Sequence, residues 1–135
     1  MRALAALLVA VAALGLAGAA VAAPSARTAA APIALAFKPL ADGPVVKVKW
    51  PYQLTATRAG KPVKGTLTVM LLDPLKQPHQ VMDDHEKPIK NRPFTGVFTD
   101  KILFPVQAQG FPLVLVFTVK SGAQKQVLEL QVQPK

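Results

Sequence analysis

The sequence predicts an all-β sandwich that follows an N-terminal segment of a different kind. From Val45 onward, apolar and polar side chains alternate with a period of two, as in strands that are buried on one face. All 13 prolines lie at or after Pro24, where they would interrupt helices. No window after residue 23 has the spacing of an amphipathic helix. We therefore expect strands joined by turns in the rest of the chain.

The first residues have the pattern of a secretory signal peptide, which we expect to be helical. Arg2 gives a positive start, and residues 3–23 carry no charged or strongly polar side chain. The small residues Ala20-Val21-Ala22 then predict cleavage after Ala22, so that residues 1–22 are removed. An uncleaved membrane anchor is the alternative, since such a run could just span about 30 Å of hydrocarbon. The pattern predicts export, to the bacterial periplasm and cell envelope or as a secreted protein.

The chain that remains after cleavage is basic and has no cysteine. Its 113 residues contain 15 Lys and Arg against 7 Asp and Glu, a net charge of +8. This charge favours anionic partners, such as acidic envelope polymers, anionic lipid head groups or nucleic acid. The lack of cysteine excludes disulfides, a thiol nucleophile and thiolate metal sites. A hydrophobic core alone must therefore stabilise the domain, which this length permits.

Residues 23–44 are predicted to form a linker rich in Pro and Ala, because prolines interrupt it repeatedly. Residues 33–37 alternate, however, and pairing as a short first strand is the alternative. The sandwich domain is expected to span residues 45–135. Strand character is found at 45–57, 66–72, 80–82, 94–100, 102–104, 113–120 and 124–133.

Two details of this pattern indicate how the strands are arranged. Val114 and Val116 are apolar on the second face of their strand, which predicts a central position in its sheet. Turn residues separate the strands at short intervals, including Ser121-Gly122 before the last strand. About seven short strands with such spacing predict an immunoglobulin-like sandwich, with a small open barrel as the alternative.

One turn carries a resemblance to a known family. Gly60-Lys61-Pro62-Val63-Lys64-Gly65, followed by Thr66-Leu67-Thr68-Val69, resembles the bacterial immunoglobulin-like modules of surface and periplasmic proteins. Those modules often carry such a hairpin between their second and third strands, and residues 94–98 and 110–116 resemble their closing strands. The resemblance implies an immunoglobulin-like antiparallel β-sandwich over residues 45–132. For function it implies only the broad range of these modules, from stalks and adhesins to small binding proteins.

The loop from His79 to Glu86 is the candidate metal site, because it contains both histidines of the chain. Imidazole with thioether suits copper, and imidazole with carboxylate suits zinc or copper(II). The candidate ligands are His79, Met82, Asp83 and His85. A solvated loop whose acidic residues are neutralised by neighbouring cations is the alternative interpretation.

Four lysines form the candidate anion-binding surface: Lys47, Lys49, Lys61 and Lys64. Outward lysines also protect strand edges from aggregation, which is the alternative interpretation. Aromatic side chains do not alternate with these cations, so the stacking pattern of single-strand nucleic-acid binders is missing. No specific nucleic-acid partner is therefore expected.

Catalysis has no support in the sequence. The serines are Ser25 and Ser121, and neither lies in a Gly-x-Ser-x-Gly motif. Asp83 and Asp84 are adjacent and would point apart, which does not suit paired carboxylate chemistry. We expect an exported, non-catalytic binding or accessory module of the cell envelope, whose partner is an unknown protein or an anionic envelope polymer. A membrane is expected as a partner only if the leader is uncleaved. A small periplasmic copper or zinc protein is the alternative.

Overall fold

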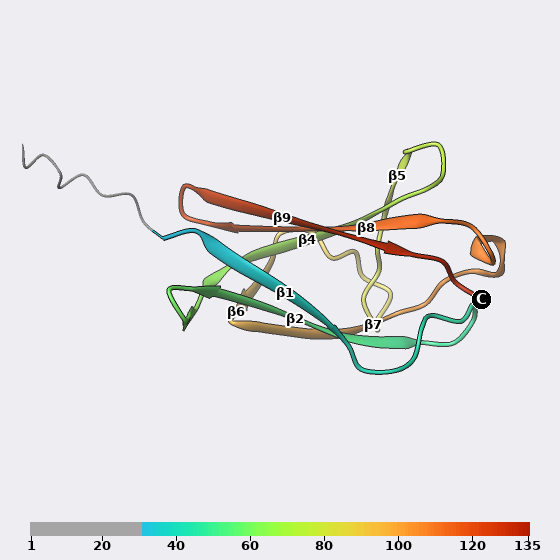
Figure 1. The fold of residues 1–135 in the computed structure, drawn as a ribbon, viewed down its shortest axis with the longest axis horizontal. Helices are drawn as coiled ribbons and strands as arrows, with labels where there is room; N and C mark the ends of the chain where they lie inside the picture. Colours follow the sequence, from blue (N-terminus) through green and yellow to red (C-terminus); the bar gives the residue numbers. More distant parts are fainter. Residues whose placement is uncertain (1–30) are drawn as a thin grey trace, which may run out of the picture. The chain divides into compact units, whose positions relative to one another are not determined.

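The computed structural model describes residues 31–135, which fold into two antiparallel sheets packed face to face (Figure 1). The predicted signal peptide, its cleavage site and the first part of the predicted linker lie outside the described residues. Within residues 31–135, no helix is long and apolar enough to cross a membrane.

The first sheet is built around β2 (Trp50–Arg58). Strand β1 (Ile33–Pro39) pairs along one edge of β2. Strands β3 (Lys61–Pro62) and β7 (Val97–Ile102) pair with β2 at successive positions. Alternate residues of β2 are buried, which places Trp50, Tyr52 and Leu54 in the core.

The second sheet has the order β5-β4-β8-β9. Its strands are β4 (Lys64–Leu72), β5 (Pro78–Gln80), β8 (Leu113–Ser121) and β9 (Gln124–Val132). Strand β6 (Arg92–Thr95) also pairs with β4, and the short 3₁₀ helix η2 (Val106–Ala108) precedes β8. Strand β8 lies between β4 and β9, so its predicted central position is confirmed.

The prediction of an all-β sandwich is confirmed. With β1, β2 and β7 in one sheet and β5, β4, β8 and β9 in the other, the strands follow the A-B-E and C′-C-F-G order of an immunoglobulin sandwich. Antibody domains join strands B and F by a disulfide. Here the rings of Phe37, Tyr52 and Phe117 meet between the sheets, with centroids 5.4–5.8 Å apart.

Two predicted boundaries at the start of the domain are wrong. The predicted linker to residue 44 includes β1, whose Ile33 is buried and whose seven residues pair with β2. The compact unit therefore begins at Ala31 and not at Val45. Residues 45–49, predicted as strand, form a loop, because the N–H of Val46 donates to Lys135 and that of Lys47 to Phe104.

The predicted turn at residues 60–65 carries the chain from one sheet to the other. Ala59 and Gly60 both have positive φ (53° and 80°), as in the two-residue hairpin turns that match strand twist. Val63 is buried between β3 and β4. At Gly65, β4 and β8 approach so closely that a Cβ would overlap the carbonyl oxygen of Lys120. Only glycine fits this position without moving a strand.

Candidate functional site

A cleft of about 1070 Å³ opens where β4 and β7 end and β8 begins. Its floor consists of core side chains, among them Phe104 and Leu115. Strand β5 and residues 81–86 line one side, and the segment after β7, residues 103–111, lines the other. The cleft therefore gives access to the apolar interior between the two sheets.

Large apolar side chains surround the opening. Leu75, Met82, Leu103 and Phe111 line the cleft and are 45 to 79% exposed. Isolated apolar residues are common on protein surfaces, but several around one opening mark a binding site. The combination of an apolar floor and an apolar rim suits a ligand with little polarity.

Trp50 lies directly behind the floor of the cleft. Its ring centroid is 6.3 Å from that of Phe104, and its indole N–H donates to the carbonyl of Asp42 at 2.9 Å. Trp50 is the only tryptophan of the chain and is buried. Its fluorescence can therefore report on a molecule that contacts Phe104.

Asp83 shapes the turn that forms one wall of the cleft. Its Oδ1 accepts the backbone N–H groups of His85 (2.8 Å) and Lys87 (2.9 Å), and its Oδ2 pairs with Arg92 at 3.0 Å. The hydrogen bond from Lys87, with those from His85 and Arg92, lowers the pKa of Asp83. Only 8% of the Asp83 side chain is exposed, so its carboxylate is a structural element of the turn.

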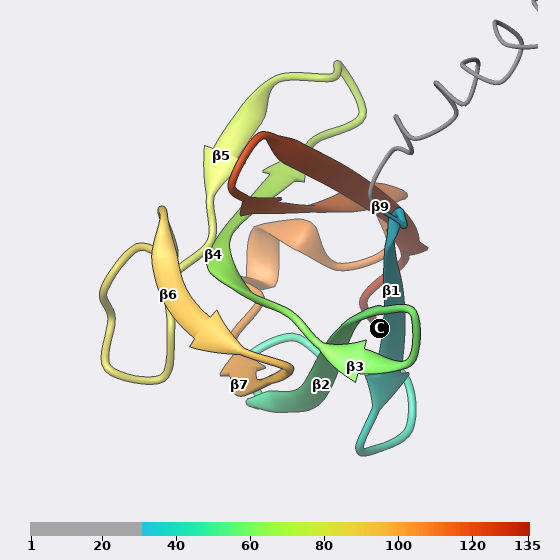
Figure 2. The same ribbon diagram turned by 90° about the vertical axis from the view of Figure 1, so that its left-hand side faces the viewer.

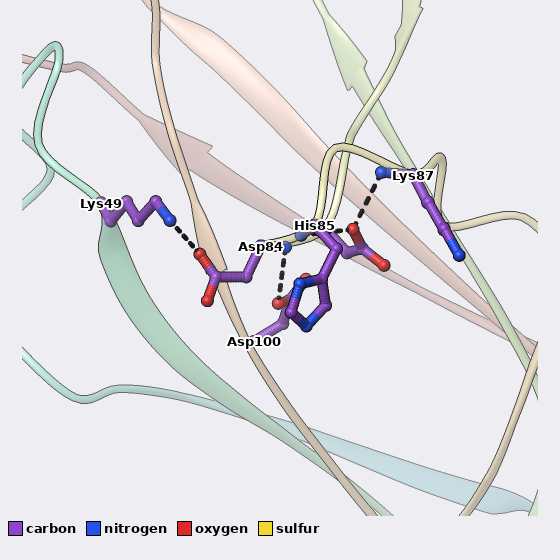
Figure 3. Close-up of polar contacts among 6 residues, drawn as sticks. Lys49, Asp84, His85, Lys87 and Asp100 are labelled. Carbon is purple, nitrogen blue, oxygen red and sulfur yellow. Dashed lines mark hydrogen bonds and ion pairs between the residues drawn. The ribbon is translucent and has the colours of Figure 1, made fainter.

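The next residue, Asp84, ties this turn to the other sheet (Figure 3). Its carboxylate pairs with Lys49, just before β2, and its N–H donates to the Oδ1 of Asp100 in β7 at 3.1 Å. The hydrogen bond from Lys49 lowers the pKa of Asp84 and raises that of Lys49. These contacts hold the wall in place across the open side of the sandwich.

The predicted metal ligands all line the cleft, but the structure does not assemble them into a metal site. His79 pairs with Asp73 at 3.0 Å and lowers the pKa of that carboxyl group, while Asp83 is occupied by its turn and by Arg92. Met82 and His85 are exposed side chains on the same loop. In the described part of the chain, no three His, Asp or Glu side chains are placed to hold a metal ion.

The four lysines predicted as one anion-binding surface lie apart. Lys47 and Lys49 precede β2, whereas Lys61 and Lys64 follow it. A strand of nine residues separates the two pairs, and such a strand is roughly 30 Å long. Lys49 is also neutralised by Asp84. The prediction of a single surface from these four residues is therefore wrong.

Two features of this region were not predicted from the sequence. Leu75 and Phe111 form part of the apolar rim, and each lies beside a proline outside any strand. A large apolar residue next to a proline in a loop is the sequence feature that could have indicated this rim. Tyr52 and Asp100 are cross-strand partners, and the Tyr52 hydroxyl and Asp100 Oδ2 are buried with no hydrogen-bond partner among residues 31–135. Burial raises the pKa of both groups.

Comparisons with protein-family models, with curated proteins and with solved structures found no match to this chain. The function is therefore argued from the cleft, its rim and the charges around it.

Proposed function

We propose that this protein is an exported, non-catalytic binding module of the bacterial cell envelope whose ligand site is the apolar cleft. Export is inferred from the leader pattern of residues 1–22. The ligand is an apolar small molecule of the acyl-chain class. The observation that carries this proposal is the ring of exposed apolar side chains above a floor of core residues.

The size and composition of the cleft support such a ligand. Small-molecule sites are about 300–1,000 Å³, mostly apolar, with a few polar groups that fix orientation. The volume of this cleft, about 1070 Å³, slightly exceeds that range, which suits an elongated molecule. Lys101 lines the cleft and forms no ion pair within residues 31–135, so it is available to pair with the head group of an anionic ligand.

The polar side chains beside the cleft support binding without catalysis. Asp83 and Asp84 are engaged in the contacts that hold the turn, and His79 is paired with Asp73. A general base or nucleophile needs a reactive group that faces the substrate and is held by a partner. These groups instead maintain the walls, so we expect affinity for a ligand and no turnover.

Fluorescence titration tests the proposal. The dye 1-anilinonaphthalene-8-sulfonate should bind at one saturable site and accept excitation energy from Trp50, and lauric acid should displace it. Leu103→Asp and Phe111→Asp should each weaken dye binding at least tenfold, because each places a charge at the apolar rim. Val127→Asp, at an exposed apolar position on β9, is the matched control and should bind as the wild type does.

Two outcomes would overturn the proposal. One is that the folded protein shows no saturable dye binding. The other is that Leu103→Asp and Phe111→Asp bind the dye as Val127→Asp does, with circular dichroism showing that all three variants are folded. In that case the dye would be bound elsewhere on the surface.

A further inference from the structure

The end of the sandwich opposite the cleft carries a group of cations, which we call the basic end. It consists of the side chains at the turn after β2, the start of β4 and the β8–β9 turn. Figure 2 shows the backbone of the sandwich from this end. Its members are Arg58, Lys61, Lys64, Lys120 and Lys125. The four lysines are exposed, and Arg58 is partly buried.

Strand pairing brings these residues together. Arg58 is the cross-strand partner of Lys61, and Lys120 is the partner of Lys125. The Ser121 hydroxyl donates to the carbonyl of Lys64 at 2.8 Å, which joins the β8–β9 turn to the start of β4. Like charges directly opposite each other on neighbouring strands are destabilising, so this arrangement has a cost in the isolated protein.

No acidic residue offsets this charge. Six of the seven Asp and Glu of the chain lie in loops or strand positions toward the other end. The seventh, Glu129 in β9, is the cross-strand partner of Val116 in β8. Val116 is four residues from Lys120 along β8, so Glu129 lies roughly 13 Å from Lys120. None of the five cations forms an ion pair within residues 31–135. The basic end therefore presents uncompensated positive charge to its surroundings.

The chain enters the sandwich at this same end. Ile33 begins β1 opposite Arg58, and the Gln124 side chain donates to the carbonyl of Ala31 at 3.0 Å. The sequence before residue 31 contains two more cations, Arg2 and Arg27, on either side of the uncharged apolar run of residues 3–23. A leader held in a membrane would therefore connect to the sandwich at its basic end.

We propose that the basic end docks on the phosphate groups of an anionic lipid surface. Lys and Arg near such a surface add attraction that falls off within a Debye length, and their long side chains reach head groups without burying the backbone. Each cation contributes about a fivefold increase in partition coefficient. This proposal uses no residue of the cleft and stands apart from the proposed ligand.

Sedimentation with lipid vesicles tests the proposal on the full chain. Vesicles with 30% phosphatidylglycerol in phosphatidylcholine are compared with pure phosphatidylcholine, which measures any contribution of the apolar run alone. Binding to the anionic vesicles should be stronger and should weaken as salt is raised from 50 to 500 mM. Replacing Lys61, Lys64, Lys120 and Lys125 by Gln should lower the partition coefficient by two to three orders of magnitude.

The matched control removes the same number of charges from other parts of the fold. Lys38, Lys76, Lys87 and Lys90 are exposed and lie outside the basic end. Their replacement by Gln should reduce binding less than tenfold. Equal losses in the two quadruple variants would show that net charge alone acts, and would overturn the proposal. Equal binding to neutral and anionic vesicles would also overturn it, as would tighter binding to a DNA duplex that is lost in the first variant.

Discussion

Removing the Asp83 carboxylate tests how the wall of the cleft is held. Asp83→Ala deletes two hydrogen bonds from backbone N–H groups and one ion pair with Arg92. A typical hydrogen bond contributes about 0.5–1.5 kcal/mol net, and one to a charged group about 1.5–3. Water reaches part of this turn, which reduces the loss. We expect Asp83→Ala to lower the free energy of unfolding by about 2–3 kcal/mol and Asp83→Asn by about 1 kcal/mol.

The dependence of the free energy of unfolding on pH provides a second measure of the contacts made by the Asp83 carboxylate. The fold lowers the pKa of Asp83, so its ionised form stabilises the protein above the unfolded value of about 4. That contribution is lost as the pH falls through the lower pKa of the folded state. The stability difference between the wild type and Asp83→Asn should therefore be constant above about pH 5 and should shrink below about pH 4.

Urea unfolding followed by Trp50 fluorescence and by circular dichroism measures both effects. Asp42→Ala is the control, because it removes the same charge from an exposed loop residue whose carboxylate has no ion pair within residues 31–135. It should change the free energy of unfolding by less than about 0.5 kcal/mol. Finding that Asp83→Ala is as stable as Asp42→Ala would refute the role given to Asp83 in the turn.

Two further substitutions test the packing of the sandwich. Gly65→Ala should lower the free energy of unfolding, measured by thermal melts, by about 2–4 kcal/mol, because β4 must move away from the carbonyl of Lys120. Gly43→Ala is the control, since a Cβ at Gly43 meets open space, and it should leave the melting temperature unchanged. Tyr52→Phe should leave the urea midpoint unchanged or raise it, because the buried hydroxyl lacks a partner. A loss of more than about 1 kcal/mol in the free energy of unfolding would show that the hydroxyl forms a hydrogen bond, for which its cross-strand partner Asp100 is the candidate acceptor.

Much of the fold could be predicted because alternation is a local signal that core burial enforces. Leu67 and Val69 in β4 are buried as the pattern indicates, and β8 is central because both of its faces are apolar. The same signal failed at residues 45–49, where alternation continues but the chain turns. The backbone partners of Val46 and Lys47 are Lys135 and Phe104, and such distant hydrogen bonds leave no trace in a local pattern.

The acidic wall of the site could be located in the sequence, but its apolar rim at Leu75 and Phe111 and the roles of the wall residues could not. The sequence predicts a binding site in the acidic loop of residues 79–86, and this loop does form a wall of the cleft. The sequence pattern predicts a metal ligand at Asp83. Aspartate can also stabilise a turn by accepting a hydrogen bond from the backbone N–H two residues ahead, and Asp83 does this with His85. The choice between these roles depends on Arg92, which reaches Asp83 only after β6 pairs with β4.

The cleft lies between β7 at the edge of the first sheet and β5 at the edge of the second sheet, which do not pair with each other. Among the described residues, β7 pairs only with β2 and β5 pairs only with β4. The chain crosses between the sheets on this side at Gly96, between β6 and β7 and near the basic end, so the sheets are not joined beside β5. The bond network of Asp84 with Lys49 and Asp100 spans part of the gap, and the apolar interior stays accessible beyond it. The basic end lies at the other end of β4, roughly 25 Å away. A molecule seated on lipid head groups by its basic end would therefore hold the cleft away from the surface, where a ligand can reach it.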